Sequence, residues 1–269
     1  MAFRLKPYLL AAVLAFLPLA SIQSAHAFDY GYMADNYFAT YHIDNAFQRN
    51  LWENQEKYGT GYKNAKKSSK KTTRSSGSTG SKSSNKADNN STAHRYMYSS
   101  GISNQVNNQM IAAMKSDLRS QGKLNSQTES QLNQLAKANL VENVKNSLKS
   151  DGYEPNSLAT AMAYWVVVNY GISQRKDLAK LKAHGMVAQL QSAIGSDSGL
   201  SSLNNSEKQK MAEMLYWAGS LQMAMYLEAL QSGNHKYINQ SVDGAKQALG
   251  KMGISASQIS DGSRGLEFR

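Results

Sequence analysis

The chain has 269 residues, of which 41% are hydrophobic and none is cysteine, and its formal net charge is +11. Without cysteine, a disulfide-stapled fold and a lipid-modified cysteine are both excluded. A chain of this length can bury one substantial core, so its stability must come from packing.

The first residues have the three parts of a secretory signal peptide. Arg4 and Lys6 form a basic start, residues 8–20 form an apolar run, and Ala25 and Ala27 place small side chains where signal peptidase cleaves. The apolar run is shorter than the roughly 20 residues that cross a bilayer. We expect cleavage after Ala27 and a mature chain, without a transmembrane helix, in the periplasm or outside the cell. An uncleaved anchor is the alternative.

The positive charge is concentrated between residues 57 and 95. This segment holds ten basic residues and one acidic residue, whereas residues 28–56 hold one and five, and residues 96–269 hold 17 and 13. From Lys63 to Thr92 no apolar side chain is larger than alanine, so burial cannot offset chain entropy. The sequence predicts four parts: a signal peptide (1–27), an aromatic-rich and helical segment (28–56), a disordered basic linker (57–95) and an α-helical domain (96–269).

The aromatic-rich segment has the spacing of a short helix. Tyr37, Tyr41, Phe47 and Leu51 suit one side of it. So short a segment cannot bury such a stripe alone. We expect it to dock on the main domain or, through Phe28 to Trp52, on a protein partner.

The linker suggests contact with anionic surfaces, because its cations occur in pairs among small polar residues. The candidate contact residues are Lys66, Lys67, Lys70, Lys71 and Arg74. Anionic lipid, polysaccharide or nucleic acid would each suit them, although no aromatic residue is interleaved for base stacking. A plain solvated spacer is the alternative.

Helical periodicity begins after the linker. Apolar residues recur every four positions over 103–121, and Gly122 provides a C-terminal stop. Ser126-Gln127-Thr128-Glu129 fits a capping box. Further apolar positions over 140–148 either extend this second helix or form a third.

Two predicted helices, over 155–170 and 211–230, are apolar on nearly every side, which is typical of buried helices. Pro155 opens the first, and Ser206 with Gln209 caps the second. In the second helix, Gly219 would let the first approach closely. These two helices are expected to form the centre of the domain.

Amphipathic helices are predicted over 178–194, passing through His184, and over 238–252. No alternating pattern long enough for a strand appears. The sequence therefore predicts an all-α fold, a compact bundle of about six to seven helices with two largely buried central helices, preceded by the disordered linker.

The helical part resembles a family of exported bacterial proteins of unknown function. The residues that carry the resemblance are Arg95-Tyr96, Gly152-Tyr153, the run Ser157 to Trp165, Gly250 to Ile254, and Gly265-Leu266. It covers about Arg95 to Phe268. The resemblance implies an exported helical domain behind a variable N-terminal region, and it implies no activity, cofactor or partner.

Chemical signatures are sparse in this sequence. The histidines after the signal peptide are scattered, which predicts no metal site, and His94 at the linker's end is expected to be solvated. Glu213 and Glu228 lie 15 residues apart on one helix, about 22 Å, too far to act on one bond. Glu213 is expected to face a polar neighbour or solvent, because buried carboxylates are rarely left unpaired. The alternative is a buried carboxylate near Tyr216 and Trp217.

A pocket for an apolar ligand between the central helices is one hypothesis, with Tyr164, Trp165, Glu213 and Trp217 as its lining. Ordinary core packing is the alternative. No cofactor is predicted.

These patterns favour an exported, non-catalytic binding or assembly module with a polycationic tether. The alternative is a secreted enzyme or effector whose site is assembled from dispersed residues, around Glu213 and Tyr164.

Overall fold

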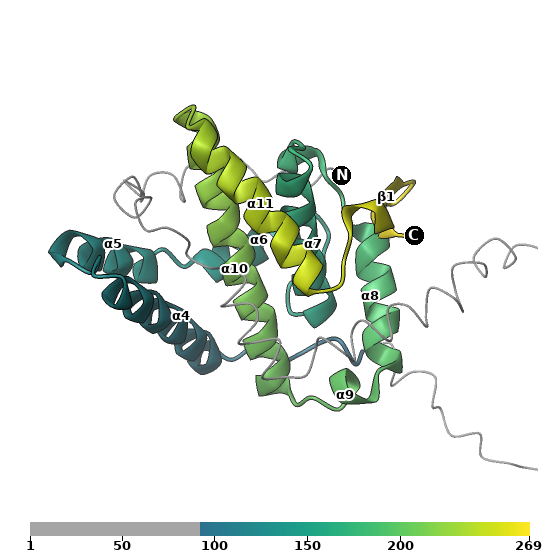
Figure 1. Cartoon of the computed structure of the whole chain (residues 1–269). Coiled ribbons are helices and arrows are strands. Elements are labelled where there is room, and N and C mark those ends of the chain that lie inside the picture. Colours follow the sequence, from purple (N-terminus) through teal and green to yellow (C-terminus); the bar gives the residue numbers. More distant parts are fainter. Residues whose placement is uncertain (1–91) are drawn as a thin grey trace, which may run out of the picture.

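The computed structural model describes residues 92–269, and these form a helical domain (Figure 1). The predictions for residues 1–91 lie outside the described residues. The elements are α4 (Ser100–Ser120), α5 (Ser126–Lys137), α6 (Leu140–Ser150), α7 (Leu158–Ser173), η3 (Leu178–Lys180), α8 (His184–Ser196), α9 (Ser198–Ser201), α10 (Asn205–Gln231), α11 (His235–Lys251), η4 (Ala256–Gln258), β1 (Ile259–Gly262) and β2 (Gly265–Phe268). Seven of the described helices have 11 residues or more, which confirms the predicted bundle.

Helix α7 lies at the centre of the domain, as its composition predicts. All of its residues are buried, and it packs against α8, α10 and α11. At Gly219 of α10, an added Cβ would lie 2.8 Å from Cε1 of Tyr164, closer than side chains tolerate. The predicted close approach of the two central helices is confirmed, and it requires glycine at this position.

Helix α10 also supports a second, smaller hydrophobic cluster on its other side. Helix α4 packs there against α10, and α5 packs against α4 (Figure 1). The cluster includes Met114, Leu118, Leu132, Trp217 and Leu221. The sequence did not decide whether residues 126–150 form one helix or two. They form two, because Asn139 adopts a left-handed conformation (φ 50°) between them. Among the described helices, none is both long and apolar enough to span a membrane.

Several predicted helix starts are wrong by one to three residues. Helix α4 begins at Ser100 rather than Ser103, and α7 begins at Leu158, after its N-cap Ser157, rather than at Pro155. The caps are Asn125 for α5 and Asn204 for α10, each in a capping box with the residue three positions later, Thr128 and Glu207. Asparagine caps a helix as well as serine does. In α10 this choice leaves Gln209 free of the cap, and its side chain is used elsewhere.

Two further differences lie in the C-terminal third. The predicted helix over 178–194 is wrong in its first half, because a short turn, η3, precedes α8 and His184 begins α8 rather than lying inside it. An antiparallel hairpin, β1–β2, was also not predicted, and it pairs Ile259 with Phe268. Each strand has only four residues, too few for a convincing alternation. The hairpin is joined to the chain before α8 by a hydrogen bond, in which the Leu266 N–H donates to the Lys182 carbonyl at 2.7 Å.

Candidate functional site

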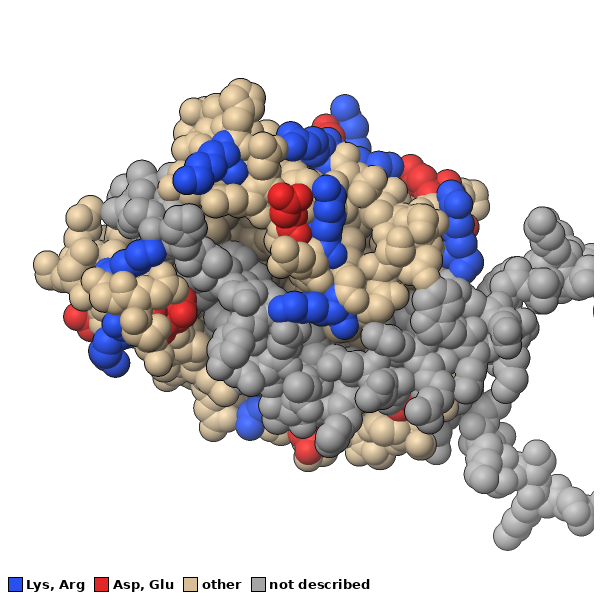
Figure 2. Space-filling model, viewed as in Figure 1, with Lys and Arg blue, Asp and Glu red and all other residues tan. Residues whose placement is uncertain are grey.

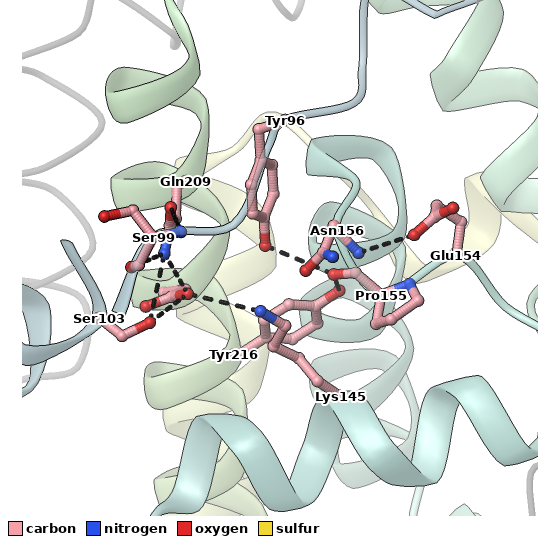
Figure 3. A network of polar contacts seen from close by, with 10 residues as sticks. Tyr96, Ser99, Ser103, Lys145, Glu154, Pro155, Asn156, Gln209 and Tyr216 are labelled. Carbon is pink, nitrogen blue, oxygen red and sulfur yellow. Dashed lines mark hydrogen bonds and ion pairs between the residues drawn. The ribbon is translucent and has the colours of Figure 1, made fainter. Parts of the chain in front are cut away.

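The candidate site is a polar cluster on α10, built on residues spaced four apart, of which Gln209 and Glu213 are buried and Asn205 is exposed. Asn205, Gln209 and Glu213 share one face of the helix, and the same stripe continues into the apolar Trp217 and Leu221. The polar half of the stripe receives the chain that leads into α4 (Figure 3). The N–H of Met97 donates to Asn205 Oδ1 at 3.2 Å.

Gln209 holds the residue that precedes α4. Its Oε1 accepts the Ser99 N–H at 2.9 Å, and its Nε2 donates to the Ser99 carbonyl at 2.8 Å. Ser99 makes no side-chain cap for α4, so this amide satisfies its backbone instead. The contact therefore fixes the start of α4 against α10.

Glu213 is the centre of the cluster and is fully buried, with 0% of its surface exposed. Its Oε1 accepts hydrogen bonds from Ser103 Oγ at 2.7 Å and from Gln209 Nε2 at 2.9 Å. The Nζ of Lys145, on α6, lies 3.6 Å from the same oxygen. Its Oε2 has no hydrogen-bond partner among the described residues. The expectation of a polar neighbour is confirmed, and that of solvent is wrong.

Lys145 is buried beside two aromatic rings. Its Nζ lies 4.1 Å from the centre of the Tyr98 ring and 5.8 Å from that of Tyr96. Burial lowers the pKa of Lys145, and the Glu213 carboxylate opposes that shift. The carboxylate on one side and the aromatic faces on the other both offset the cost of burying the ammonium charge.

Two tyrosines fasten the loop before α7 at the edge of the cluster. The hydroxyl groups of Tyr96 and Tyr216 donate to the Pro155 carbonyl, at 3.4 and 3.0 Å (Figure 3). Burial raises the pKa of both phenols well above the ordinary value, so they stay neutral donors.

His94 belongs to this anchoring and is buried, so its prediction as a solvated residue is wrong. Its Nδ1 shares a hydrogen bond of 2.8 Å with Oγ of Ser157, the N-cap of α7. Its carbonyl accepts the Leu158 N–H at 2.8 Å, and Arg95 forms a β-bridge with Ser157. The first N–H groups of α7 have no partner within the helix, so bonding to residues 94 and 95 is favourable. The sequence around His94 does not show this, because α7 lies far along the chain.

The four residues of the hypothetical pocket have different surroundings. Tyr164 shares a hydrogen bond of 3.1 Å with Ser220 and lies edge-on to Tyr216, and Trp165 belongs to the same large cluster. Trp217 lies in the smaller cluster with α4 and α5, and Glu213 is in the polar cluster. All four side chains are buried. The pocket stays a prediction.

The linker cations from Lys66 to Arg74 lie outside the described residues. His184 stacks on Tyr153 with ring centres 4.2 Å apart, and burial lowers its pKa. Within residues 92–269, no three His, Asp or Glu side chains are grouped so that they could hold a metal ion.

Sequence reasoning missed Lys145, Ser103 and Gln209 as members of the cluster. One signal could have found part of it: Glu213 interrupts the apolar run over 211–230 and follows Asn205 and Gln209 at a spacing of four residues. Such a stripe implies polar partners from elsewhere in the chain. Which partners they are depends on how α4 and α6 pack, and spacing does not give that.

Comparison with protein families places the chain. The model of a family of unknown function, DUF6683, matches residues 6–269. The chain belongs to this family. The prediction of an uncharacterised family is thus confirmed, and the match is longer than the resemblance over Arg95 to Phe268, since it also includes the basic segment and the residues before it. No curated protein and no solved structure matches the chain.

Proposed function

We propose that this protein is an exported, non-catalytic binding module that attaches to anionic surfaces through its basic segment, residues 57–95. The proposal is supported by the charge of that segment, which holds ten basic residues and one acidic residue. Opposite charge attracts such a segment to phosphate or carboxylate arrays without any shaped pocket.

The observation that carries the proposal is the way the end of this segment is joined to the domain. From His94 to Ser99 the backbone is bonded to two helices and to the loop before one of them. The His94 carbonyl accepts the Leu158 N–H of α7, and the Tyr96 N–H donates to the Asn156 carbonyl at 3.1 Å. The N–H groups of Met97 and Ser99 donate to side chains of α10. The covalent chain joins the segment to the domain, and these contacts fix the place where the segment meets the fold, beside α7 and α10.

The test is binding of the chain from Phe28 to Arg269 to anionic and neutral vesicles, to an anionic polysaccharide and to DNA, at low and moderate salt. A variant with Lys66, Lys67, Lys70, Lys71 and Arg74 all changed to Gln should lose most of its binding and of its salt dependence, since each cation near an anionic surface adds attraction. A matched variant with the four lysines changed to Arg and Arg74→Lys keeps the charge and should bind like the wild type. Unchanged binding of the Gln variant would refute the tether.

Export is proposed from the signal-like first 27 residues. N-terminal sequencing of the protein recovered outside the cytoplasm should give a chain that begins at Phe28. A recovered chain that still begins at Met1 would contradict cleavage.

A further inference from the structure

The folded domain has a charge asymmetry of its own. Residues 174–183 and 235–269 together hold nine lysines and arginines and four acidic residues, whereas the other described residues hold nine of each sign. The whole excess of five positive charges therefore belongs to these two stretches. The nine cations, here called the basic face, are Arg175, Lys176, Lys180, Lys182, Lys236, Lys246, Lys251, Arg264 and Arg269, and all of them are exposed.

The two stretches lie next to each other in the fold. The Arg175 guanidinium donates to Asn239 Oδ1 of α11 at 2.6 Å, and the Lys182 carbonyl accepts the Leu266 N–H of the hairpin. Figure 2, in the view of Figure 1, shows most of the visible lysine and arginine side chains over α11 and the neighbouring ends of α7 and α8. The excess charge is thus gathered on one side of the domain.

Two ion pairs within the basic face are exposed to solvent. Lys180 pairs with Asp177 at 3.2 Å and Lys246 with Asp243 at 3.5 Å, and these side chains are more than half exposed. Exposed pairs at this spacing are weak and exchange readily with another anion. Lys180 and Lys246 can therefore leave these pairs and bind another anion.

The shape of the basic face favours a broad ligand. Helix α11 alone has 17 residues, about 25 Å, which is far wider than a single small anion. The large hydrophobic side chains that are exposed in residues 92–269 are Met97, Tyr98 and Leu230, none of them in these two stretches. Base stacking and insertion into a membrane therefore both lack the side chains they need. Attraction between the exposed cations and a flat array of phosphates is the mode of binding that fits these residues.

We propose that the basic face docks the helical domain on an anionic lipid surface through contacts with head groups alone. The inference rests on the proposed function, because the basic segment would bind the same surface. The segment and the face have the same sign of charge, so they repel each other and both remain available to the lipid. Two linked sites on one surface bind more tightly than either one alone.

The test uses the chain from Phe28 to Arg269 and vesicles of phosphatidylcholine, with and without phosphatidylglycerol. The triple variant Lys236→Gln, Lys246→Gln, Lys251→Gln removes three charges from the basic face. We expect its partition onto anionic vesicles to fall by roughly tenfold to a hundredfold, with no change on neutral vesicles.

The matched control removes three exposed charges from the electrically balanced part of the domain: Arg119→Gln, Lys137→Gln, Lys149→Gln. It should bind nearly as the wild type does, and circular dichroism checks that both variants fold. Equal loss in the two triple variants, or no loss in either, would overturn the inference. So would a basic-face variant that loses affinity for duplex DNA while it keeps its affinity for vesicles.

A further set of variants distinguishes failure of the tether from failure of the basic face. In it, both triple variants are also made in the background of the protein whose basic segment has the five Gln substitutions. If that background alone binds vesicles like the wild type, the tether is wrong, and the basic face is still measured by the difference between the triple variants. If the background alone loses binding but the two triple variants never differ, the tether stands and the basic face is wrong.

Discussion

The two sides of α10 are built from different chemistry. The side that faces α7 is mostly apolar, apart from the hydrogen bond between Tyr164 and Ser220. The two helices are so close there that Gly219 has no room for a Cβ beside Tyr164. The side that faces α4 and α6 begins with the buried Glu213 cluster and only then becomes apolar. Apolar contacts supply most of the burial, whereas directional contacts decide which residue of the incoming chain meets which residue of α10.

The largest expected effect comes from breaking the ion pair on the polar side. Glu213→Gln leaves Lys145 buried without a carboxylate, which should lower the free energy of unfolding by about 3–5 kcal/mol. Urea denaturation measures it. Adding Lys145→Met should recover much of the loss, because no uncompensated charge is then left buried.

The matched control is Glu129→Gln, which breaks the partly exposed pair with Lys115 at 3.2 Å. Such pairs contribute about 0–1 kcal/mol. If Glu213→Gln costs no more than Glu129→Gln, the cluster does not hold α10, α6 and α4 together as described.

The next effect compares the two hydrophobic clusters by removing a fully buried leucine from each. Leu118→Ala in the α4–α5 cluster and Leu158→Ala in the α7 cluster should each cost about 2–5 kcal/mol. Hydrogen exchange should separate them, because Leu118→Ala is expected to lower protection in α4 and α5 more than in α7. Equal loss of protection in all helices after Leu118→Ala would show that the two clusters unfold as one unit.

Overfilling the apolar side should have a smaller effect. Gly219→Ala places a methyl group against the Tyr164 ring and should destabilise the domain by about 1–3 kcal/mol in thermal or urea unfolding. Gly244→Ala in α11 is the control, because a Cβ there meets nothing within 4 Å and the substitution should be stabilising. A neutral Gly219→Ala would mean that α7 and α10 are less closely packed.

The smallest effect concerns His184, which begins α8 and belongs to neither side of α10. Burial lowers its folded pKa below the ordinary 6.5, so the unfolded chain binds the proton more readily. Stability is therefore lost as pH falls from about 7 through 6.5 and toward the folded pKa. His184→Phe keeps a ring on Tyr153 and should lose less stability than the wild type between neutral and mildly acidic pH. Identical pH profiles for the two proteins would contradict this.

Much of the apolar side was predictable from the sequence. Residues 158–173 are apolar enough to require burial, and Gly219 marks where a neighbour approaches. Periodicity also predicted about six to seven helices in residues 96–269, a range that includes the seven long helices of the structure. These features are local or repeat along the chain, so one sequence contains them.

The polar side could not be predicted in the same way. Glu213 and Lys145 are 68 positions apart, and Ser103 is 110 positions from Glu213. Nothing in the spacing connects them, because the contacts exist only after α4, α6 and α10 have packed. The burial of His94 depends likewise on Ser157, 63 positions away.

The central claim is that the chain entering the domain is anchored on α10 by the polar stripe. Native-state hydrogen exchange of the Ser99 and Met97 amides in a Gln209→Ala variant tests it most directly, with the α7 amides as internal reference. The contacts predict that Ser99, which donates to Gln209, loses most of its protection, and that Met97, which donates to Asn205, loses less, while α7 is unchanged. Full protection of Ser99 in this variant would contradict the anchoring of this part of the chain on α10.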